Sequence, residues 1–304
     1  MARSARGRIG TDIGLSLRMF LTMALLAAVY TFFMWVLWSA GAGPVFIIAV
    51  AAVMLGFQYF YSDRLVLWSM KARIVGPGEE PQLHAMLERL AAQADLPTPK
   101  LAIVDTMMPN AFATGRNQKN SVVAVTRGLV HRLDPQEVEA VIAHELAHIK
   151  HRDVALMTLA GFFATVASMI VQNYYYLMMF GGMGGRRDDR NGNAAALVWV
   201  VSLLVWLISY FLIRALSRYR EFAADRGAAI ITGQPANLMS ALTKISGAVS
   251  RIPEQDLRRV EGMNAFFIIP ALRRGGLSEL FSTHPSLERR LANLRRIEQE
   301  MHGR

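Results

Sequence analysis

Long apolar runs alternate with polar segments along the chain, and the runs are long enough to cross a membrane. Four of them contain no charged residue: Met19 to Trp38, Pro44 to Tyr61, Val154 to Phe180 and Ala194 to Ile213. A helix of about 20 residues spans the roughly 30 Å of hydrocarbon in a bilayer. The pattern therefore predicts a mostly α-helical integral membrane protein with four transmembrane helices.

The first two runs form a predicted hairpin whose outer ends are basic. Only a short uncharged turn, Ser39 to Gly43, separates the two runs. By the positive-inside rule, the N-terminus and the chain after the second run face the cytoplasm. A cleaved signal peptide is the alternative, but the first run is long for one and a second run follows at once. The basic residues that set this orientation are Arg3, Arg6, Arg8, Arg18, Arg64, Lys71 and Arg73.

The third and fourth runs predict a second hairpin, joined by the linker 181–193. Two crossings return the chain to the side that it left. The linker, GGMGGRRDDRNGN, carries basic residues that favour the inside, so a buried or re-entrant pair is the alternative. We expect four parts: a hairpin over 1–62, the first part of a water-exposed domain over 63–153, a second hairpin over 154–213 and the rest of that domain over 214–304.

The polar segments have the periodicities of a mixed α and β domain. Apolar residues repeat at helical spacing from Gln82 to Ala94. Further helices are predicted over Asn237 to Val249 and over Ser286 to Met301. Three β-like pieces lie between the first of these helices and residue 130, at Leu101 to Asp105, Ala111 to Gly115 and Ser121 to Val130.

Charge and cysteine content narrow the class of protein. A net charge of +10 would suggest nucleic acid as a partner of a soluble chain. Here the basic residues lie near the ends of apolar runs, a placement that orients membrane proteins, so we expect no nucleic-acid partner. A generic basic surface is the alternative. The chain has no cysteine, which excludes disulfides, a cysteine nucleophile and cysteine-ligated zinc.

A helix with metal-ligand spacing begins after Asp134. This residue and Glu137 are the residue types of a capping box. Further along, His144 and His148 are one turn apart, so both imidazoles project from one face and can hold one Zn²⁺. Glu145 is offset by about 100° and can reach the metal's water without being a ligand. The alternative is a pair of solvated histidines on an amphipathic helix.

A catalytic zinc needs a third protein ligand. His151 lies about 10 Å along the axis from His144, too far for one straight helix to supply all three, and we expect it to be a polar cap at the membrane boundary. A helix from Arg214 to Ile230 brings Glu221 to the metal if the second hairpin forms. Asp225, on the same face, can then accept a hydrogen bond from a ligand imidazole. The alternative for Glu221 is a surface acid paired with a nearby arginine.

Four motifs in one order resemble those of the HtpX-type membrane zinc metalloproteases, relatives of the CAAX prenyl proteases. They are PNAFATG at 109–115, HELAH at 144–148, REFAAD at 220–225 and STHPSLERR at 282–290, with two apolar runs before and two between. The resemblance covers nearly the whole chain, although the linker 181–193 looks peculiar to it. It implies a cytoplasmic α+β zinc metalloprotease domain of gluzincin-like type. One Zn²⁺ would be held by His144, His148 and Glu221.

The resemblance also implies roles for neighbouring residues and a location. Glu145 would be the catalytic base, and Asp225 would orient a ligand histidine. The protein would lie in the bacterial inner membrane, with its active site on the cytoplasmic side.

Two of the motifs also have a physical interpretation of their own. Asn110, Ala111, Phe112 and Ala113 begin a short strand, and an edge strand beside the zinc can pair with an extended substrate. A plain core strand is the alternative. His284 can donate a hydrogen bond to the oxyanion of the transition state, or it is a structural histidine before a proline.

Together these patterns predict a zinc endopeptidase that acts on misfolded or damaged membrane proteins and other unfolded polypeptides. If the chain is helical from His148 to Val154, the metal lies about 9 Å outside the bilayer, where water reaches it and a segment leaving the lipid meets it. A narrow processing enzyme resembling the prenyl proteases is one alternative, but four runs do not suggest their larger membrane chamber. A non-enzymatic scaffold or transporter is another, and it leaves the His-Glu-His spacing unexplained.

Overall fold

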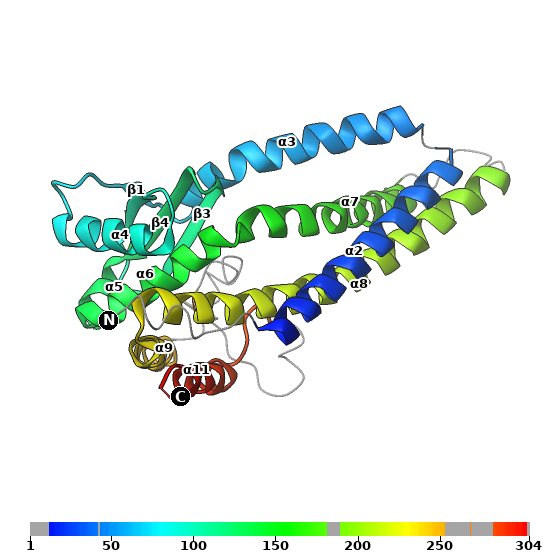
Figure 1. Cartoon of the computed structure of the whole chain (residues 1–304). Helices are drawn as coiled ribbons and strands as arrows, with labels where there is room; N and C mark the ends of the chain where they lie inside the picture. Colours follow the sequence, from blue (N-terminus) through cyan, green and yellow to red (C-terminus); the bar gives the residue numbers. More distant parts are fainter. Residues whose placement is uncertain (1–11, 42, 181–188, 253–267, 269–281, 303–304) are drawn as a thin grey trace.

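Long membrane helices extend from one end of a smaller α and β domain, as Figure 1 shows for the computed structural model. The structure describes residues 12–41, 43–180, 189–252, 268 and 282–302. Most of the linker 181–193 and part of the chain before the last helix lie outside the described residues. The expected mixed membrane and water-exposed architecture is confirmed.

Three of the four predicted membrane-spanning runs are found as candidate spans in the described part of the chain. The helices α2 (Ile13–Ser39), α7 (Asp153–Phe180) and α8 (Asp189–Thr232) contain stretches long and apolar enough to span a bilayer. The second apolar run also forms a helix, α3 (Pro44–Ser69). It is not among the spans found in the described part of the chain, so its crossing stays a prediction.

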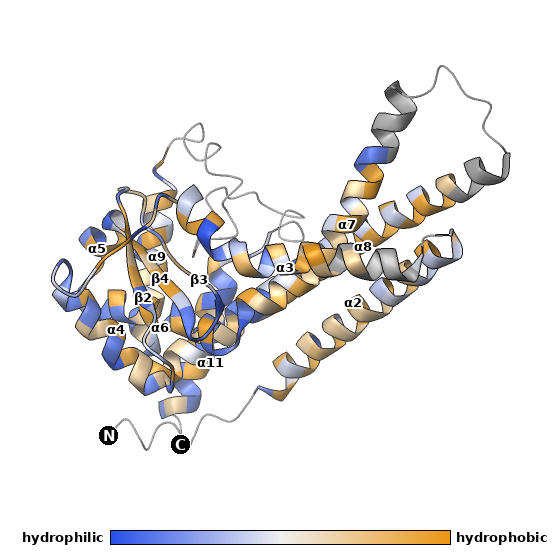
Figure 2. Cartoon of the chain, turned by 90° about the horizontal axis from the view of Figure 1, so that it is seen from above, coloured by the Kyte–Doolittle hydropathy of each residue, from blue (hydrophilic) through white to orange (hydrophobic). Residues whose placement is uncertain are grey.

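The helices α2, α7 and α8 pack on one another through a shared apolar cluster. Leu26 and Phe33 of α2, Ala167 of α7, and Val205 and Leu216 of α8 are buried in it. The outer faces of these helices remain apolar, as the colouring in Figure 2 shows, and large side chains such as those of α2 are exposed there. Exposed apolar surface of this extent fits a lipid environment.

A four-stranded sheet forms the centre of the other domain. Its strands are β1 (Arg73–Ile74), β2 (Lys100–Val104), β3 (Ala111–Asn117) and β4 (Asn120–Thr126). The order is β1-β2-β4-β3, with β2 and β4 parallel and the other neighbours antiparallel. The strand β3 is therefore an edge of the sheet.

The strand prediction from Ser121 to Val130 is wrong at its end. The strand β4 stops at Thr126, and the helix α5 (Arg127–Arg132) follows directly. Thr126 Oγ1 accepts a hydrogen bond from the backbone N–H of Leu129 at 3.2 Å, which caps that helix. The short strand β1 was not predicted, because two residues carry no recognisable periodicity.

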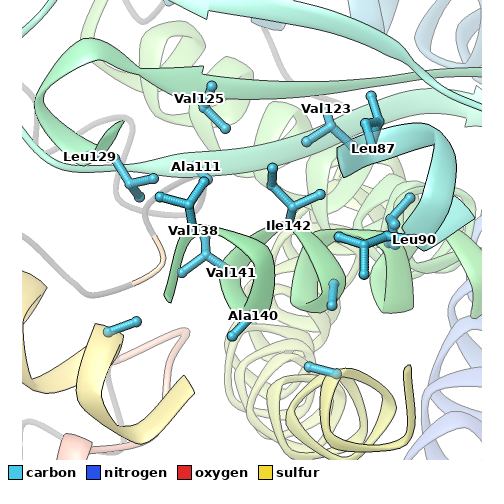
Figure 3. Close-up of a cluster of buried hydrophobic side chains, with 14 of the residues drawn as sticks. Leu87, Leu90, Ala111, Val123, Val125, Leu129, Val138, Ala140, Val141 and Ile142 are labelled. Carbon is cyan, nitrogen blue, oxygen red and sulfur yellow. The ribbon is translucent and has the colours of Figure 1, made fainter. Parts of the chain in front are cut away.

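Helices cover the sheet on both faces. One face packs against α4 (Pro81–Ala94) and α6 (Pro135–Lys150), and behind them lie α9 (Pro235–Val249) and α11 (Leu287–His302). In Figure 3, Val138 and Ile142 of α6 face Val125 and Val123 of β4. The other face packs against the end of α3, through residues such as Leu67. These contacts hold α6 firmly beneath the sheet.

The capping prediction for α6 is confirmed. The backbone N–H of Asp134 donates to Glu137 Oε2 at 2.9 Å. The other carboxylate oxygen of Glu137, Oε1, accepts a hydrogen bond from Ser240 of α9 at 2.6 Å. The start of α6 is therefore fixed both locally and to a neighbouring helix.

The two connections between the membrane helices and the domain, through α8 and from α6 to α7, differ. The run that ends at Ile213 and the helix predicted from Arg214 to Ile230 are one continuous helix of 44 residues, α8. In contrast, the chain is not helical throughout from His148 to Val154. The helix α6 ends at Lys150, Arg152 has a φ of 57°, and α7 begins at Asp153. The condition for the 9 Å distance, an unbroken helix from His148 to Val154, is therefore not met.

Candidate metal centre

Two helices that are far apart in the sequence bring two imidazoles and a carboxylate together. His144 and His148 come from α6, and Glu221 comes from α8. The Nε2 atoms of the histidines are 3.2 Å apart. Glu221 Oε2 is 3.7 Å from His144 Nε2, and its Oε1 is 3.4 Å from His148 Nε2. One ligand atom from each residue lies within 4.8 Å of the others, so the three can hold a metal ion.

Small residues allow α6 and α8 to approach so closely. A Cβ atom added to Gly227 of α8 would lie 2.5 Å from the Cβ of Ala147 of α6, closer than real Cβ atoms come to one another. Ala147 lies between the two histidines in the sequence of α6, and Gly227 follows Glu221 by six residues in α8. The close crossing at this pair therefore sets the distance between the carboxylate and the imidazoles.

The outer nitrogen of each imidazole contacts a buried carboxylate. His144 Nδ1 is 3.1 Å from Asp225 Oδ1, and His148 Nδ1 is 2.6 Å from Asp153 Oδ2. Both aspartates are almost completely buried. A carboxylate at Nδ1 favours the tautomer with its proton on that atom, which leaves the lone pair of Nε2 directed at the shared centre. The sequence identified Asp225 for this position, but it did not identify Asp153.

The donor set fits a divalent metal ion. In the described residues, Glu221 Oε2 is buried and forms no contact with hydrogen-bond geometry, although Arg290 Nη1 and His284 Nδ1 each lie 3.2 Å away. Two lone pairs of Nε2 and a buried carboxylate around one point repel each other unless a proton or a metal ion lies between them. Two histidines and one glutamate are a ligand set that Zn²⁺ uses in catalytic sites, with a further position open.

The two imidazoles bind protons more strongly than an exposed histidine when no metal is present. Burial lowers the pKa of His148, but the carboxylates of Asp153 and Glu221 outweigh burial and raise it to about 10. Burial also lowers the pKa of His144, and Asp225 and Glu221 raise it above its ordinary value. The same carboxylates therefore attract either protons or a metal ion to this point.

A buried arginine, which the sequence did not identify, completes the second layer of the centre. Arg290 of α11 forms a two-pronged ion pair with Asp225, from Nε to Oδ2 at 3.0 Å and from Nη2 to Oδ1 at 2.6 Å. Nη1 donates to the backbone oxygen of Ile268 at 2.8 Å. The signal was available in the sequence, because Arg290 lies three residues after Leu287 and four before Leu294, on the apolar stripe of its helix.

A cavity of about 360 Å³ opens beside these residues. Glu145, almost fully buried, lines it together with both histidines and Glu221. His284 also lines it, and its Nδ1 lies 3.2 Å from Glu221 Oε2. Five of the residues predicted for this site, His144, Glu145, His148, Glu221 and His284, thus line one space, and Asp225 lies outside it.

The predicted substrate strand, β3, lies at an edge of the sheet and borders the same cavity. Ala111, Phe112 and Ala113 of β3 are among the lining residues. Asn110, which precedes them, is buried, and its Oδ1 accepts a hydrogen bond from the backbone N–H of Ile268 at 3.0 Å. Its side chain anchors the strand rather than projecting into the cavity.

His151 lies apart from the three metal-binding candidates, as expected. It caps the C-terminus of α6, and its backbone N–H donates to Ala147 at 3.0 Å. In the described part of the chain, the metal-binding group contains only His144, His148 and Glu221.

Comparisons with known proteins find peptidases. The model of the family described as Peptidase family M48 matches residues 77–298. The chain is 64% identical over 299 residues to the "Protease HtpX homolog" of Moorella thermoacetica, covering 98% of this chain and 99% of the relative. It is 58% identical over 290 residues to the "Protease HtpX homolog 2" of Methanosarcina mazei, covering 95% and 97%.

A solved structure shares the fold. The crystal structure of S. mikatae Ste24p superimposes with a TM-score of 0.55 at 20% identity, covering 93% of this chain and 65% of that one. The chain thus spans slightly less than two thirds of Ste24p, and at this identity the likeness concerns the fold alone.

Proposed function

Because the chain belongs to peptidase family M48, we propose that it hydrolyses peptide bonds of misfolded or damaged membrane proteins at the cytoplasmic face of the membrane. Membership of the family makes it a membrane metalloprotease. We propose Zn²⁺ as its metal, held by His144, His148 and Glu221. A bacterial inner-membrane location is part of the same proposal, and the basic ends of the first hairpin support the cytoplasmic orientation of the domain.

The side chains that line the cavity can take different catalytic roles in peptide hydrolysis. Zn²⁺, when bound, polarises the scissile carbonyl and lowers the pKa of its water to about 7. Glu145 accepts the proton of the attacking water and passes it to the nitrogen of the leaving amine. His284, on the same cavity, donates a hydrogen bond to the oxygen that becomes negatively charged. The edge strand β3 pairs with the backbone of the substrate and holds it extended.

One observation carries the choice of membrane proteins as substrates. The cavity that contains the candidate metal ligands is also lined by residues of three long apolar helices. A polypeptide segment that leaves the bilayer along these helices therefore reaches the reacting groups without crossing the water-exposed domain. The residues concerned are Gln58, Ser62 and Val66 of α3, Val154, Met157 and Thr158 of α7, and Ser217 of α8.

The proposal is tested with purified protein in liposomes that also contain an unstable membrane protein. We expect wild-type protein to cleave it, and Glu145→Gln to bind the same amount of zinc but lose cleavage. Retained cleavage by that variant would overturn the role of Glu145 as the base. Glu221→Ala is expected to lower the zinc content, and an unchanged zinc content would remove Glu221 from the ligand set.

The same assay separates this function from narrow processing. Two or more unrelated unstable membrane proteins are offered, together with a peptide that ends in a prenyl-protease motif. Cleavage of the unrelated proteins at several internal positions supports quality control. Products restricted to the C-terminal motif would instead establish a processing enzyme.

A further inference from the structure

A second cleft, distinct from the metal centre, lies where α3 meets the edge strand β3. It has a volume of about 460 Å³ and is lined by residues of both elements. The α3 residues lie within three turns of the helix, and one arginine near the end of β3 closes the cleft from the other side. Its lining residues are Gly56, Phe57, Phe60, Tyr61, Arg64 and Arg116.

Both arginines of this cleft lie over aromatic rings. The Cζ of Arg116 is 5.6 Å from the centre of the Phe60 ring, and that of Arg64 is 6.0 Å from the centre of the Tyr61 ring. Among the described residues, neither guanidinium has a carboxylate within ion-pair distance, in contrast to arginines such as Arg127. The cleft thus combines two uncompensated positive charges with an aromatic floor.

The position of the cleft along α3 matches the border of the bilayer. Ser62 of α3 lines the metal cavity together with Val154 and Thr158 of α7, so these residues lie at one level. The membrane-spanning stretch of α7 begins at Asp153. Charged and aromatic side chains at this level meet the phosphates and glycerol groups of lipids.

We propose that this cleft binds the phosphate headgroup of an anionic phospholipid. Arg64 and Arg116 contact the phosphate, since guanidinium groups form paired hydrogen bonds to phosphate oxygens. The rings of Phe57 and Phe60, which are 59% and 54% exposed, contact the glycerol and the first part of the acyl chains. A soluble anion or an acidic peptide would leave these rings in water, and for that reason a lipid is the better match.

A lipid bound in this cleft contacts α3 and β3, and both elements also line the metal cavity. The helix α3 supplies Gln58 and Ser62 to that cavity, and β3 supplies Ala111 to Thr114. A headgroup held by Arg64 on the helix and Arg116 on the strand bridges the same two elements from their outer side. The binding step itself does not depend on the proposed peptidase activity and can be measured without it.

The test uses full-length protein in nanodiscs and spin-labelled lipids, with the immobilised fraction read by electron paramagnetic resonance. We expect wild-type protein to immobilise phosphatidylglycerol in preference to phosphatidylcholine. Replacing one arginine, in Arg64→Gln or Arg116→Gln, is expected to lower this preference about fivefold, and replacing both is expected to lower it about twentyfold.

A matched variant removes the same charge elsewhere. Arg132 of α5 and Arg295 of α11 are exposed and lie on other elements of the domain, so Arg132→Gln with Arg295→Gln is expected to leave the preference unchanged. An equal loss in both double variants would overturn the site and indicate general electrostatic attraction. An acidic peptide that displaces the lipid label would overturn the assignment to a lipid. Unchanged thermal unfolding of the variants shows that each is folded.

Discussion

The Nδ1 atom of His148 lies 2.6 Å from Oδ2 of Asp153, the first residue of the membrane helix α7. The other oxygen of this carboxylate is 3.0 Å from Nε of Arg220, which precedes Glu221 on α8. One imidazole of the candidate metal centre is therefore oriented by the start of one membrane helix. The other membrane helix, α8, supplies Glu221, the third candidate ligand. It also supplies Arg220, whose positive charge balances the negative charge of Asp153.

Removing this carboxylate is expected to weaken metal binding. In Asp153→Ala, the imidazole of His148 loses the contact that fixes its orientation and tautomer, and metal affinity falls about 10- to 100-fold. Competition with a fluorescent chelator measures the affinity in detergent solution. Asp105→Ala is the control, because the side chain of Asp105 is 74% exposed. Equal affinity of the two variants would contradict the positioning role.

The buried ion pair of Arg290 is expected to matter for stability. Arg290→Gln leaves the carboxylates of Asp225 and Glu221 buried with less compensation, which costs about 3–5 kcal/mol of unfolding free energy. Denaturant unfolding of the metal-free protein measures this loss. Adding Asp225→Asn removes one of the two charges and is expected to recover part of it.

An exposed arginine serves as the control for that measurement. Arg296 pairs with Asp12 at 3.0 Å, and its side chain is 55% exposed. Arg296→Gln is therefore expected to cost less than about 1 kcal/mol. A loss as small in Arg290→Gln would show that burial of its ion pair contributes little.

The crossing of α6 and α8 is expected to be sensitive to a single methyl group. Gly227→Ala places a Cβ against Ala147, pushes the helices apart and costs about 1–3 kcal/mol, with weaker metal binding because Glu221 moves from the histidines. Ala147→Gly in the same chain is expected to restore metal binding. Gly161→Ala is the matched control, since a Cβ there meets nothing within 4 Å. Normal metal binding by Gly227→Ala alone would contradict this account.

Metal binding is expected to strengthen as the pH rises. Because the pKa of His148 is raised to about 10 in the metal-free state, this imidazole carries a proton at neutral pH, and a metal must displace it. The affinity therefore rises about tenfold per pH unit below that value. Chelator competition at several pH values measures the slope. A flat profile between pH values of about 6 and 8 would show that the imidazole is already neutral.

Much of the membrane part could be predicted from the sequence, because apolar runs and helix length are local properties. The HExxH pattern likewise predicted His144 and His148, since their separation is fixed by one helical turn. The end of β4 differs from the prediction because apolar residues resume at Leu129 and Val130, and only the hydrogen bond from the Leu129 N–H to the Thr126 side chain shows that a helix has begun.

Other parts of the site depend on contacts that no local pattern records. Asp153 is the residue before an apolar run, and nothing in its neighbours indicates that it faces His148. Arg290 occupies an apolar position of its helix, but its partner Asp225 lies 65 residues earlier in the chain. Such pairs become visible only when the helices are assembled.

The uninterrupted course of α8 also links the bilayer to the chemistry. Its 44 residues correspond to a rod about 66 Å long, with an apolar run mostly in its first half and Glu221 in its last third. A rod of this kind cannot change its tilt without displacing its tip, whereas α6 is held by the sheet. We therefore expect membrane thickness, which sets the tilt of spanning helices, to act through α8 on its crossing with α6 and so on the spacing between a carboxylate and two imidazoles.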